Sequence, residues 1–216
     1  MRLALIHSPF VGPSTWSLVA GAMRRAHVVR YGGVSGPDWY DGAGRRIIAQ
    51  ADSEAWVAVL HSGAGPIAPS LAAFAVNLHG FIFVDAVLPH PGKSSVEVAP
   101  AAQIEQFRAV TSADGLLPKW NHWFPRAILE AWLPDPQTRA SVLADIPAVP
   151  FEFLQAKAPD HEEWEALPAR FVRLSEGYET NAQRAEERGW PVTRIEANHL
   201  AMISHPAGVI AALGVW

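Results

Sequence analysis

The sequence has no cysteine among its 216 residues, which excludes disulfide bonds, thiolate catalysis and cysteine-based zinc sites. Positive charge is also scarce, because 17 lysines and arginines stand against 21 acidic residues and no basic run occurs. Proteins that bind nucleic acid carry a basic surface that neutralises phosphates. We therefore expect no nucleic-acid partner.

Long apolar runs are missing as well. No stretch approaches the roughly eighteen consecutive apolar residues of a membrane helix, and the apolar run that ends at Ile6 is far too short for a signal-peptide core. We therefore expect no membrane partner and a cytoplasmic location. Arginine far outnumbers lysine and alanine is abundant, which favours a bacterial source.

What the chain does have is enough apolar material for one folded domain, since 50% of its residues are hydrophobic. Short apolar runs alternate with helix-like segments, which predicts a parallel sheet with crossover helices. We expect strands at residues 3–6, 28–30, 56–60, 81–84, 171–174 and 191–195. We expect helices at residues 14–25, where Ser14 is the expected N-cap, and at residues 43–51, 67–76, 179–188 and 206–213.

Between residues 89 and 168 the pattern changes, because prolines and tryptophans cluster there and only short amphipathic pieces lie between them. We interpret residues 1–88 and 169–216 as the core and residues 89–168 as an inserted cap. Trp120 and Trp123 in this region suggest a pocket for an apolar or aromatic substrate of modest size. Ordinary packing of a small cap explains the same residues equally well.

The most informative residue is Ser62, which follows the apolar strand 56–60 and precedes the small residues Gly63, Ala64 and Gly65. A strand that turns sharply into a helix lifts a serine hydroxyl above the edge of the sheet. The N–H of Gly63 then lies where it can bind a developing oxyanion. The pattern predicts a nucleophilic serine, although Leu60 stands where such turns normally have a small residue.

The order of these features resembles the α/β-hydrolase superfamily over essentially the whole chain. The run from His7-Ser8-Pro9 to Trp16 is similar to the opening of small hydrolases of the plant methylesterase and hydroxynitrile lyase type, and Asn198-His199-Leu200 follows the last expected strand. The resemblance implies an α/β-hydrolase fold, a mostly parallel sheet flanked by helices with a small helical cap. It also implies that His199 is the catalytic base, which takes the serine proton and returns it to the leaving group.

The carboxylate that orients His199 is left open by the resemblance. Most of the superfamily has an aspartate after the strand represented here by residues 171–174, but Tyr178 stands near that place, with Glu176 and Glu179 in the same loop. Some lipases of this fold carry the acid where Asp85 ends the strand 81–84. A carboxylate there is costly to bury unless it is paired. We rank Asp85 first, Glu176 second and Glu179 third.

The second oxyanion donor is the other open question. In the families resembled, the N–H two residues after His7 points into the oxyanion hole, but that residue is Pro9, which has no N–H. Losing such a donor costs about 2.7–4 kcal/mol of transition-state stabilisation. Phe10 through a shifted loop, the Ser8 side chain, or a reaction that needs no full oxyanion hole would each resolve the difficulty.

These residues favour a serine hydrolase that acts on a small, mostly apolar ester, thioester or lactone through an acyl-enzyme. One alternative is a lyase, cyclase or eliminating enzyme in which Ser62 and His199 move protons, and another is a non-catalytic binding protein. No cofactor is expected, and the other histidines lack the spacing of a metal site. The expected partner is a small-molecule substrate, and a homodimer stays open.

Overall fold

The computed structural model describes residues 1–32, 36–51 and 54–214. Within these residues, six parallel strands form one sheet in the order β2-β1-β3-β4-β5-β6, which confirms the predicted parallel sheet. The strands are β1 (Arg2–Ile6), β2 (Ala26–Val29), β3 (Trp56–His61), β4 (Leu78–Val84), β5 (Ala169–Arg173) and β6 (Val192–Arg194).

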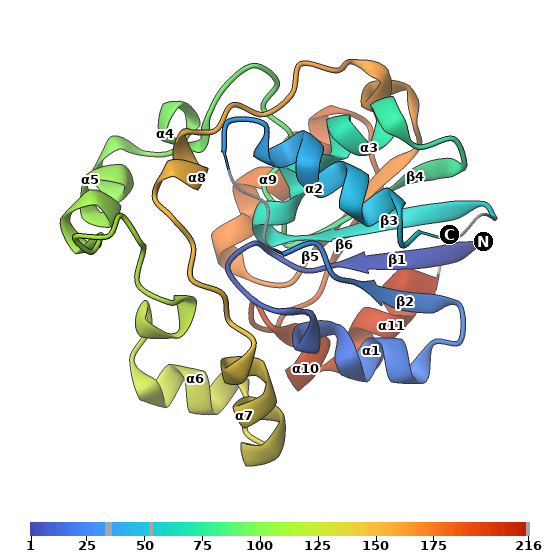
Figure 1. The fold of residues 1–216 in the computed structure, drawn as a ribbon. Coiled ribbons are helices and arrows are strands. Elements are labelled where there is room, and N and C mark those ends of the chain that lie inside the picture. Colours follow the sequence, from blue (N-terminus) through green and yellow to red (C-terminus); the bar gives the residue numbers. More distant parts are fainter. Residues whose placement is uncertain (33–35, 52–53, 215–216) are drawn as a thin grey trace.

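Helices cover both faces of this sheet (Figure 1). Successive side chains of β3 point to opposite faces, so Ala58 and Leu60 join one apolar core while Val57 and Val59 join another. The first core is covered by α2 (Trp39–Ile48), α3 (Ala68–Phe74) and α9 (Glu179–Glu187). The second is covered by α1 (Ser17–Ala22), α10 (Ala201–Ser204) and α11 (Pro206–Gly214).

The described part of the chain also contains 3₁₀ turns, some of which run directly into helices, and the apolar periodicity did not reveal them. The turns are η1 (Pro13–Trp16), η2 (Ser62–Ile67), η3 (Trp120–His122), η4 (Glu163–Ala166) and η5 (Glu176–Tyr178). The expectation of one helix over residues 14–25 with Ser14 as its N-cap is wrong. Ser14 instead donates from its N–H and its hydroxyl to the carboxylate of Asp145, at 2.9 and 2.7 Å, because a distant segment brings a stronger acceptor to it.

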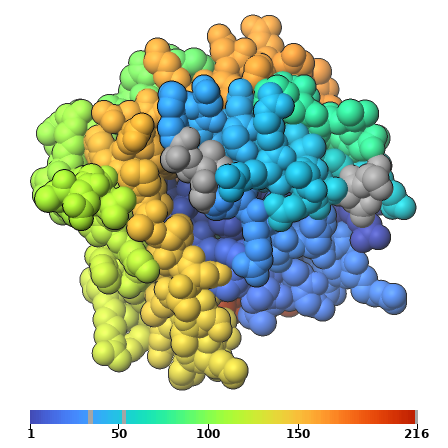
Figure 2. All heavy atoms as spheres, in the orientation of Figure 1, coloured from blue at the N-terminus to red at the C-terminus, as the bar shows by residue number. Residues whose placement is uncertain are grey.

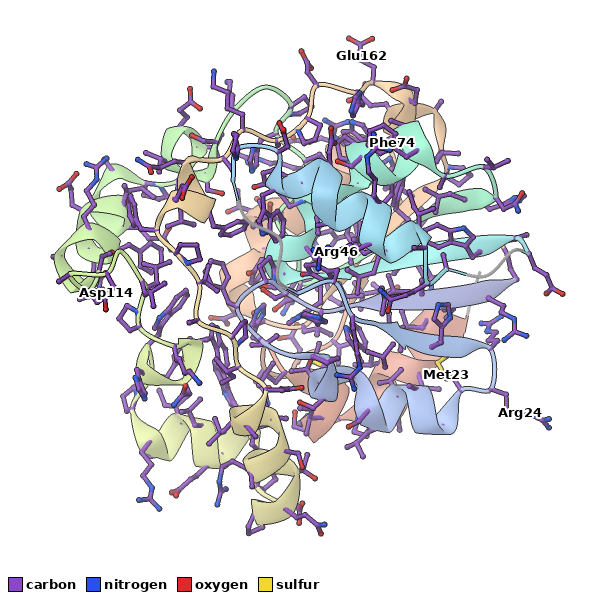
Figure 3. All side chains as sticks on the ribbon, in the orientation of Figure 1. Met23, Arg24, Arg46, Phe74, Asp114 and Glu162 are labelled. Atoms are coloured by element: carbon purple, nitrogen blue, oxygen red, sulfur yellow. The ribbon has the colours of Figure 1, made fainter. Side chains whose placement is uncertain are left out.

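The 89–168 segment lies between β4 and β5 and projects beyond the carboxyl ends of the strands (Figure 1). Its helices are α4 (Ser95–Val98), α5 (Ala101–Val110), α6 (Arg126–Trp132), α7 (Pro136–Ala144) and α8 (Glu152–Gln155). Isolated bridges join Ser94 to Lys157 and Leu116 to Pro150, so the outgoing and returning parts of the segment are tied together. Asp114 points outward from its far end (Figure 3).

The rim of the molecule carries exposed charges such as those of Arg24 and Glu162, whose side chains extend away from the ribbon (Figure 3). None of the helices in the described part of the chain has the length and apolar character needed to cross a membrane.

Candidate active site

Ser62 lies directly after β3, at the point where the strand turns into η2. Its backbone has a φ of 56°, and among the described non-glycine residues only Ser62 and Asp85, with a φ of 43°, have positive φ. Such a conformation costs of order 1–3 kcal/mol and persists only where the surrounding structure imposes it. The two strained positions belong to the predicted nucleophile and to the first-ranked acid.

Close packing around the turn explains its small residues. A Cβ atom on Gly65 would lie 1.8 Å from the carbonyl oxygen of Val87, in the chain that leaves β4, so only glycine fits there. The Val87 N–H donates to the carbonyl of Ser62 at 3.0 Å and fastens the two strand ends together. Leu60, the bulky residue at the entry to the turn, is fully buried in the core beneath α2 and α3.

Asp85 and His199 form the central contact of the site. Asp85 is completely buried at the end of β4, and its Oδ2 accepts a hydrogen bond from His199 Nδ1 at 2.7 Å. The hydroxyl of Ser175 donates to the same oxygen at 2.6 Å, while the N–H groups of Leu174 and Ser175 donate to Oδ1 at 2.8 and 3.0 Å. Four donors therefore satisfy a carboxylate that would be too costly to bury alone.

The structure brings neither of the other predicted acids to His199. Glu176 lies in η5 with its side chain exposed. Glu179, at the start of α9, pairs with Arg173 at 3.0 Å and with Arg194 at 2.7 Å. The pairing lowers the pKa of Glu179, with the hydrogen bond from Arg194 as the main cause. Among the described residues, Asp85 is thus the carboxylate that His199 contacts.

His61, the residue before Ser62, contacts both the backbone and the ring of His199. Its Nε2 donates to the carbonyl oxygen of His199 at 3.1 Å, and the two rings lie 4.6 Å apart. Burial holds the pKa of His61 well below its usual value, so the ring is neutral. No role in the site was predicted for His61, whose place directly before Ser62 brings its ring to the loop that carries His199.

Tyr178 enters the site where an aspartate is usual in the resembled families. Its hydroxyl lies 3.1 Å from Ser62 Oγ, and its ring stacks on that of His199 with centroids 4.9 Å apart and planes 2° from parallel. Burial raises the pKa of Tyr178 to about 12, so the phenol is protonated at neutral pH. Across the described residues, no hydrogen bond joins Ser62 Oγ to His199, and Tyr178 is the partner of the serine hydroxyl.

The loop after β1 packs against Gly63, the residue that follows Ser62. A Cβ atom on Gly63 would lie 3.3 Å from Pro9 Cδ and 3.5 Å from Ser8 Oγ, which places this loop against the turn. The Phe10 N–H is directed at Ser8 Oγ, over a long 3.4 Å. The backbone donor expected at Phe10 is therefore engaged within its own loop, and Pro9 offers none.

The two tryptophans predicted to border a substrate pocket, Trp120 and Trp123, lie differently. Trp120 is only 5% exposed and its ring centroid is 6.5 Å from that of His199. Trp123 is half-buried and packs against Phe10, with ring centroids 5.1 Å apart. Aromatic side chains of the segment therefore reach the loop that carries Phe10 and the ring of His199.

A hollow opens where the chain around residues 145–153 meets the loops after β1 and β2 (Figure 2). Its volume is about 340 Å³, and its lining includes His7, Pro9, Tyr31, Trp39 and Phe153. Tyr31 donates to the carbonyl of His7 at 2.5 Å and stacks on its ring, which holds this side of the loop in place. Pro9 lines this hollow and also borders Gly63, so the same residue contacts the hollow and the turn that begins at Ser62.

No protein-family model matches the sequence, and the curated proteins contain no match to it. Solved structures do resemble it. An extracellular α/β-hydrolase from a Paenibacillus species is 14% identical with a TM-score of 0.75, covering 99% of this chain and 97% of that one. A pyrethroid hydrolase from Sphingobium faniae is 16% identical with a TM-score of 0.68, covering 99% and 96%. A methylketone synthase from tomato is 15% identical with a TM-score of 0.67, covering 98% and 95%.

Structural similarity at sequence identities this low shows a shared fold only. The chemistry has to be argued from the residues of the site. The structural similarity covers nearly the full length of this chain and of each solved structure. On this evidence the chain has the α/β-hydrolase fold.

Proposed function

We propose that the protein is a serine hydrolase that cleaves a small, mostly apolar ester, thioester or lactone through an acyl-enzyme on Ser62. The observation that carries the proposal is the 2.7 Å contact between His199 Nδ1 and the buried carboxylate of Asp85, beside a serine held on a strained turn. A carboxylate in this position fixes the imidazole as the Nδ1–H tautomer and leaves Nε2 free to accept a proton.

In the proposed reaction, Ser62 Oγ turns toward His199, gives its proton to Nε2 and bonds to the carbonyl carbon. The carbonyl oxygen becomes an oxyanion that the Gly63 N–H stabilises. His199 then returns the proton to the leaving group as the bond to it breaks. Water then bonds to the acyl carbon and gives its proton to His199 Nε2. The bond between this carbon and Ser62 Oγ breaks, His199 returns the proton to Oγ, and the acid product leaves.

The surroundings of the serine support the proposed substrate class. Ser62 is 7% exposed, and the aromatic rings of Phe10, Trp120 and Trp123 lie in the neighbouring loop and in the 89–168 segment. Such walls favour a compact apolar acyl or alcohol group.

The decisive experiment is the intact mass of the protein after treatment with a fluorophosphonate, compared with Ser62→Ala and with Ser141→Ala. Ser141 lies exposed on α7, remote in sequence from the turn, and serves as the matched control. One adduct on the wild type and on Ser141→Ala, lost in Ser62→Ala, is expected. Labelling that survives in Ser62→Ala would contradict the proposal.

A second candidate function is supported by the oxyanion loop. Pro9 has no N–H and the Phe10 N–H is directed at Ser8, so the loop presents a poor oxyanion hole. A lyase, cyclase or eliminating enzyme that uses Ser62 and His199 to move protons needs no acyl intermediate. Turnover that requires Ser62 but never acylates it would favour this candidate. Ligand-induced thermal stabilisation without turnover, unchanged in Ser62→Ala, would favour a binding protein instead.

A further inference from the structure

The hydroxyl of Tyr178 contacts the reacting oxygen of Ser62, and the resemblance to known families assigns it no role. It lies 3.1 Å from Ser62 Oγ, and its ring is held flat against His199. The loop that normally donates to the oxyanion is deficient at the same time, because Pro9 lacks an N–H. The site thus lacks the N–H that would be expected at Pro9 and has, in the Tyr178 hydroxyl, a hydrogen-bond donor with no assigned role.

Tyr178 is held rigidly, as a catalytic donor must be. On one side, Ser175 is tied to Asp85 by two hydrogen bonds, and the Tyr178 N–H donates to the Ser175 carbonyl at 3.1 Å. On the other side, Glu179 is fixed by Arg173 and Arg194. The hydroxyl therefore reaches Ser62 with little freedom to move away.

We propose that Tyr178 is a catalytic residue whose hydroxyl serves as the second oxyanion donor, in place of the backbone N–H that Pro9 cannot supply. The proposal rests on the proposed function, since it assigns a role within the acyl transfer at Ser62. At rest the Tyr178 hydroxyl binds Ser62 Oγ. As Ser62 turns to His199 and bonds to the carbonyl carbon, the hydroxyl shifts its hydrogen bond to the carbonyl oxygen.

The shift is geometrically small, because in the tetrahedral intermediate Ser62 Oγ and the oxyanion are bonded to the same carbon. The Tyr178 hydroxyl, which lies 3.1 Å from Ser62 Oγ, therefore has to move by no more than the separation of two oxygens on one carbon to keep its hydrogen-bond distance. No proton is transferred by Tyr178 in this step. The serine proton goes to His199, the oxyanion receives two hydrogen bonds from Gly63 and Tyr178, and the phenol keeps its own proton because burial raises its pKa to about 12.

The test compares Tyr178→Phe with Tyr40→Phe. The first removes the hydroxyl and keeps the ring that stacks on His199, and the second removes the hydroxyl of another buried tyrosine, on α2. Two assays are run. The first gives the rate constant for phosphonylation of Ser62 by a fluorophosphonate, and the second gives kcat and KM on aryl acetates with leaving groups of different pKa. Melting temperatures and the pH profile of kcat/KM show whether the fold and His199 are intact.

For Tyr178→Phe we expect about a 10²–10³-fold loss in kcat and in the phosphonylation rate, equal across leaving groups. KM should stay within about threefold of wild type, because the interaction is made mainly in the transition state. The pKa seen in the pH profile should not move, since the ring stack and the Asp85 contact remain, and Tyr40→Phe should behave as wild type.

Three results would overturn the inference in distinguishable ways. Equal phosphonylation and turnover of Tyr178→Phe and wild type would refute the role of Tyr178 while Ser62 catalysis stands. A loss that grows with the pKa of the leaving group would show that Tyr178 protonates the leaving group instead of binding the oxyanion. A wild-type protein with neither a Ser62 adduct nor Ser62-dependent turnover would refute the proposed function, and this inference with it.

Discussion

Replacing Asp85 with asparagine is the sharpest perturbation of the proposed site, because it changes one atom of a fully mapped network. The amide oxygen can still accept from the N–H groups of Leu174 and Ser175, as Oδ1 does now. The amide NH₂ takes the place of Oδ2, which now accepts from His199 Nδ1 and from the Ser175 hydroxyl. A donor there forces His199 to use Nδ1 as an acceptor and to carry its proton on Nε2.

His199 in that tautomer cannot take the proton of Ser62. The corresponding Asp to Asn change in a serine protease lowers kcat by about 10⁴-fold for this reason. We expect a loss of the same order here, which corresponds to about 5.4 kcal/mol of transition-state stabilisation. The unfolding free energy should fall by only about 1–3 kcal/mol, because most hydrogen bonds of the network survive or reverse direction.

The assay is the second-order rate constant for phosphonylation of Ser62, which does not depend on knowing the substrate. The matched control is Glu176→Gln, which removes an exposed carboxylate from η5, the turn after β5. We expect the control to stay within about threefold of wild type, as surface substitutions commonly do. A Glu176→Gln variant that loses as much as Asp85→Asn, with both folded, would refute the assignment of the acid.

Two further predictions concern stability. Gly65→Ala should lower the unfolding free energy by about 1–3 kcal/mol, because its Cβ would lie 1.8 Å from the Val87 carbonyl oxygen. Gly21→Ala should raise the unfolding free energy by roughly 0.5–1 kcal/mol, because Gly21 lies in α1 and a Cβ there would have nothing within 4 Å. Chemical denaturation measures both, and a neutral Gly65→Ala would contradict the packing argument. Because burial lowers the pKa of His61 below the value of about 6.5 expected when unfolded, the unfolded chain binds the extra proton first, and stability should fall by up to about 1.4 kcal/mol per pH unit as pH drops below 6.5. His61→Gln should reduce that slope, and an unchanged slope would show that His61 does not carry it.

The sheet was predictable from the sequence because its strands are short apolar runs that lie in the core. β3, for example, spans Trp56–His61 where residues 56–60 were expected, and all of its side chains are buried. Helix boundaries were less accurate, since α2 begins at Trp39 and not at residue 43, and the segment after Ser62 begins as a 3₁₀ turn. Periodicity identifies an apolar face but does not show where hydrogen bonding changes from one helical type to another.

The placement of Ser62 and Asp85 at the same edge of the sheet also follows from sequence order. Both residues end parallel strands that are neighbours in the sheet, and the carboxyl ends of such strands meet at the same edge. His199 was expected from the family resemblance. The contact of Ser14 with Asp145 was not predictable, because it joins a loop of the core to a segment whose path no local pattern specifies.

Leu60, Pro9 and Tyr178 all depart from the pattern of the resembled families, and they show why a motif describes a site incompletely. Leu60 is accommodated by the core, so the turn does not require a small residue there. Pro9 removes a donor from one loop, and Tyr178 brings a hydroxyl to the same serine from another. An oxyanion requires hydrogen-bond donors at a point in space and is indifferent to which loop supplies them. A sequence rule that looks for the second oxyanion donor at the position of Pro9 would classify this site as defective. If Tyr178 acts as we propose, the site is complete, because the donor comes from the loop after β5.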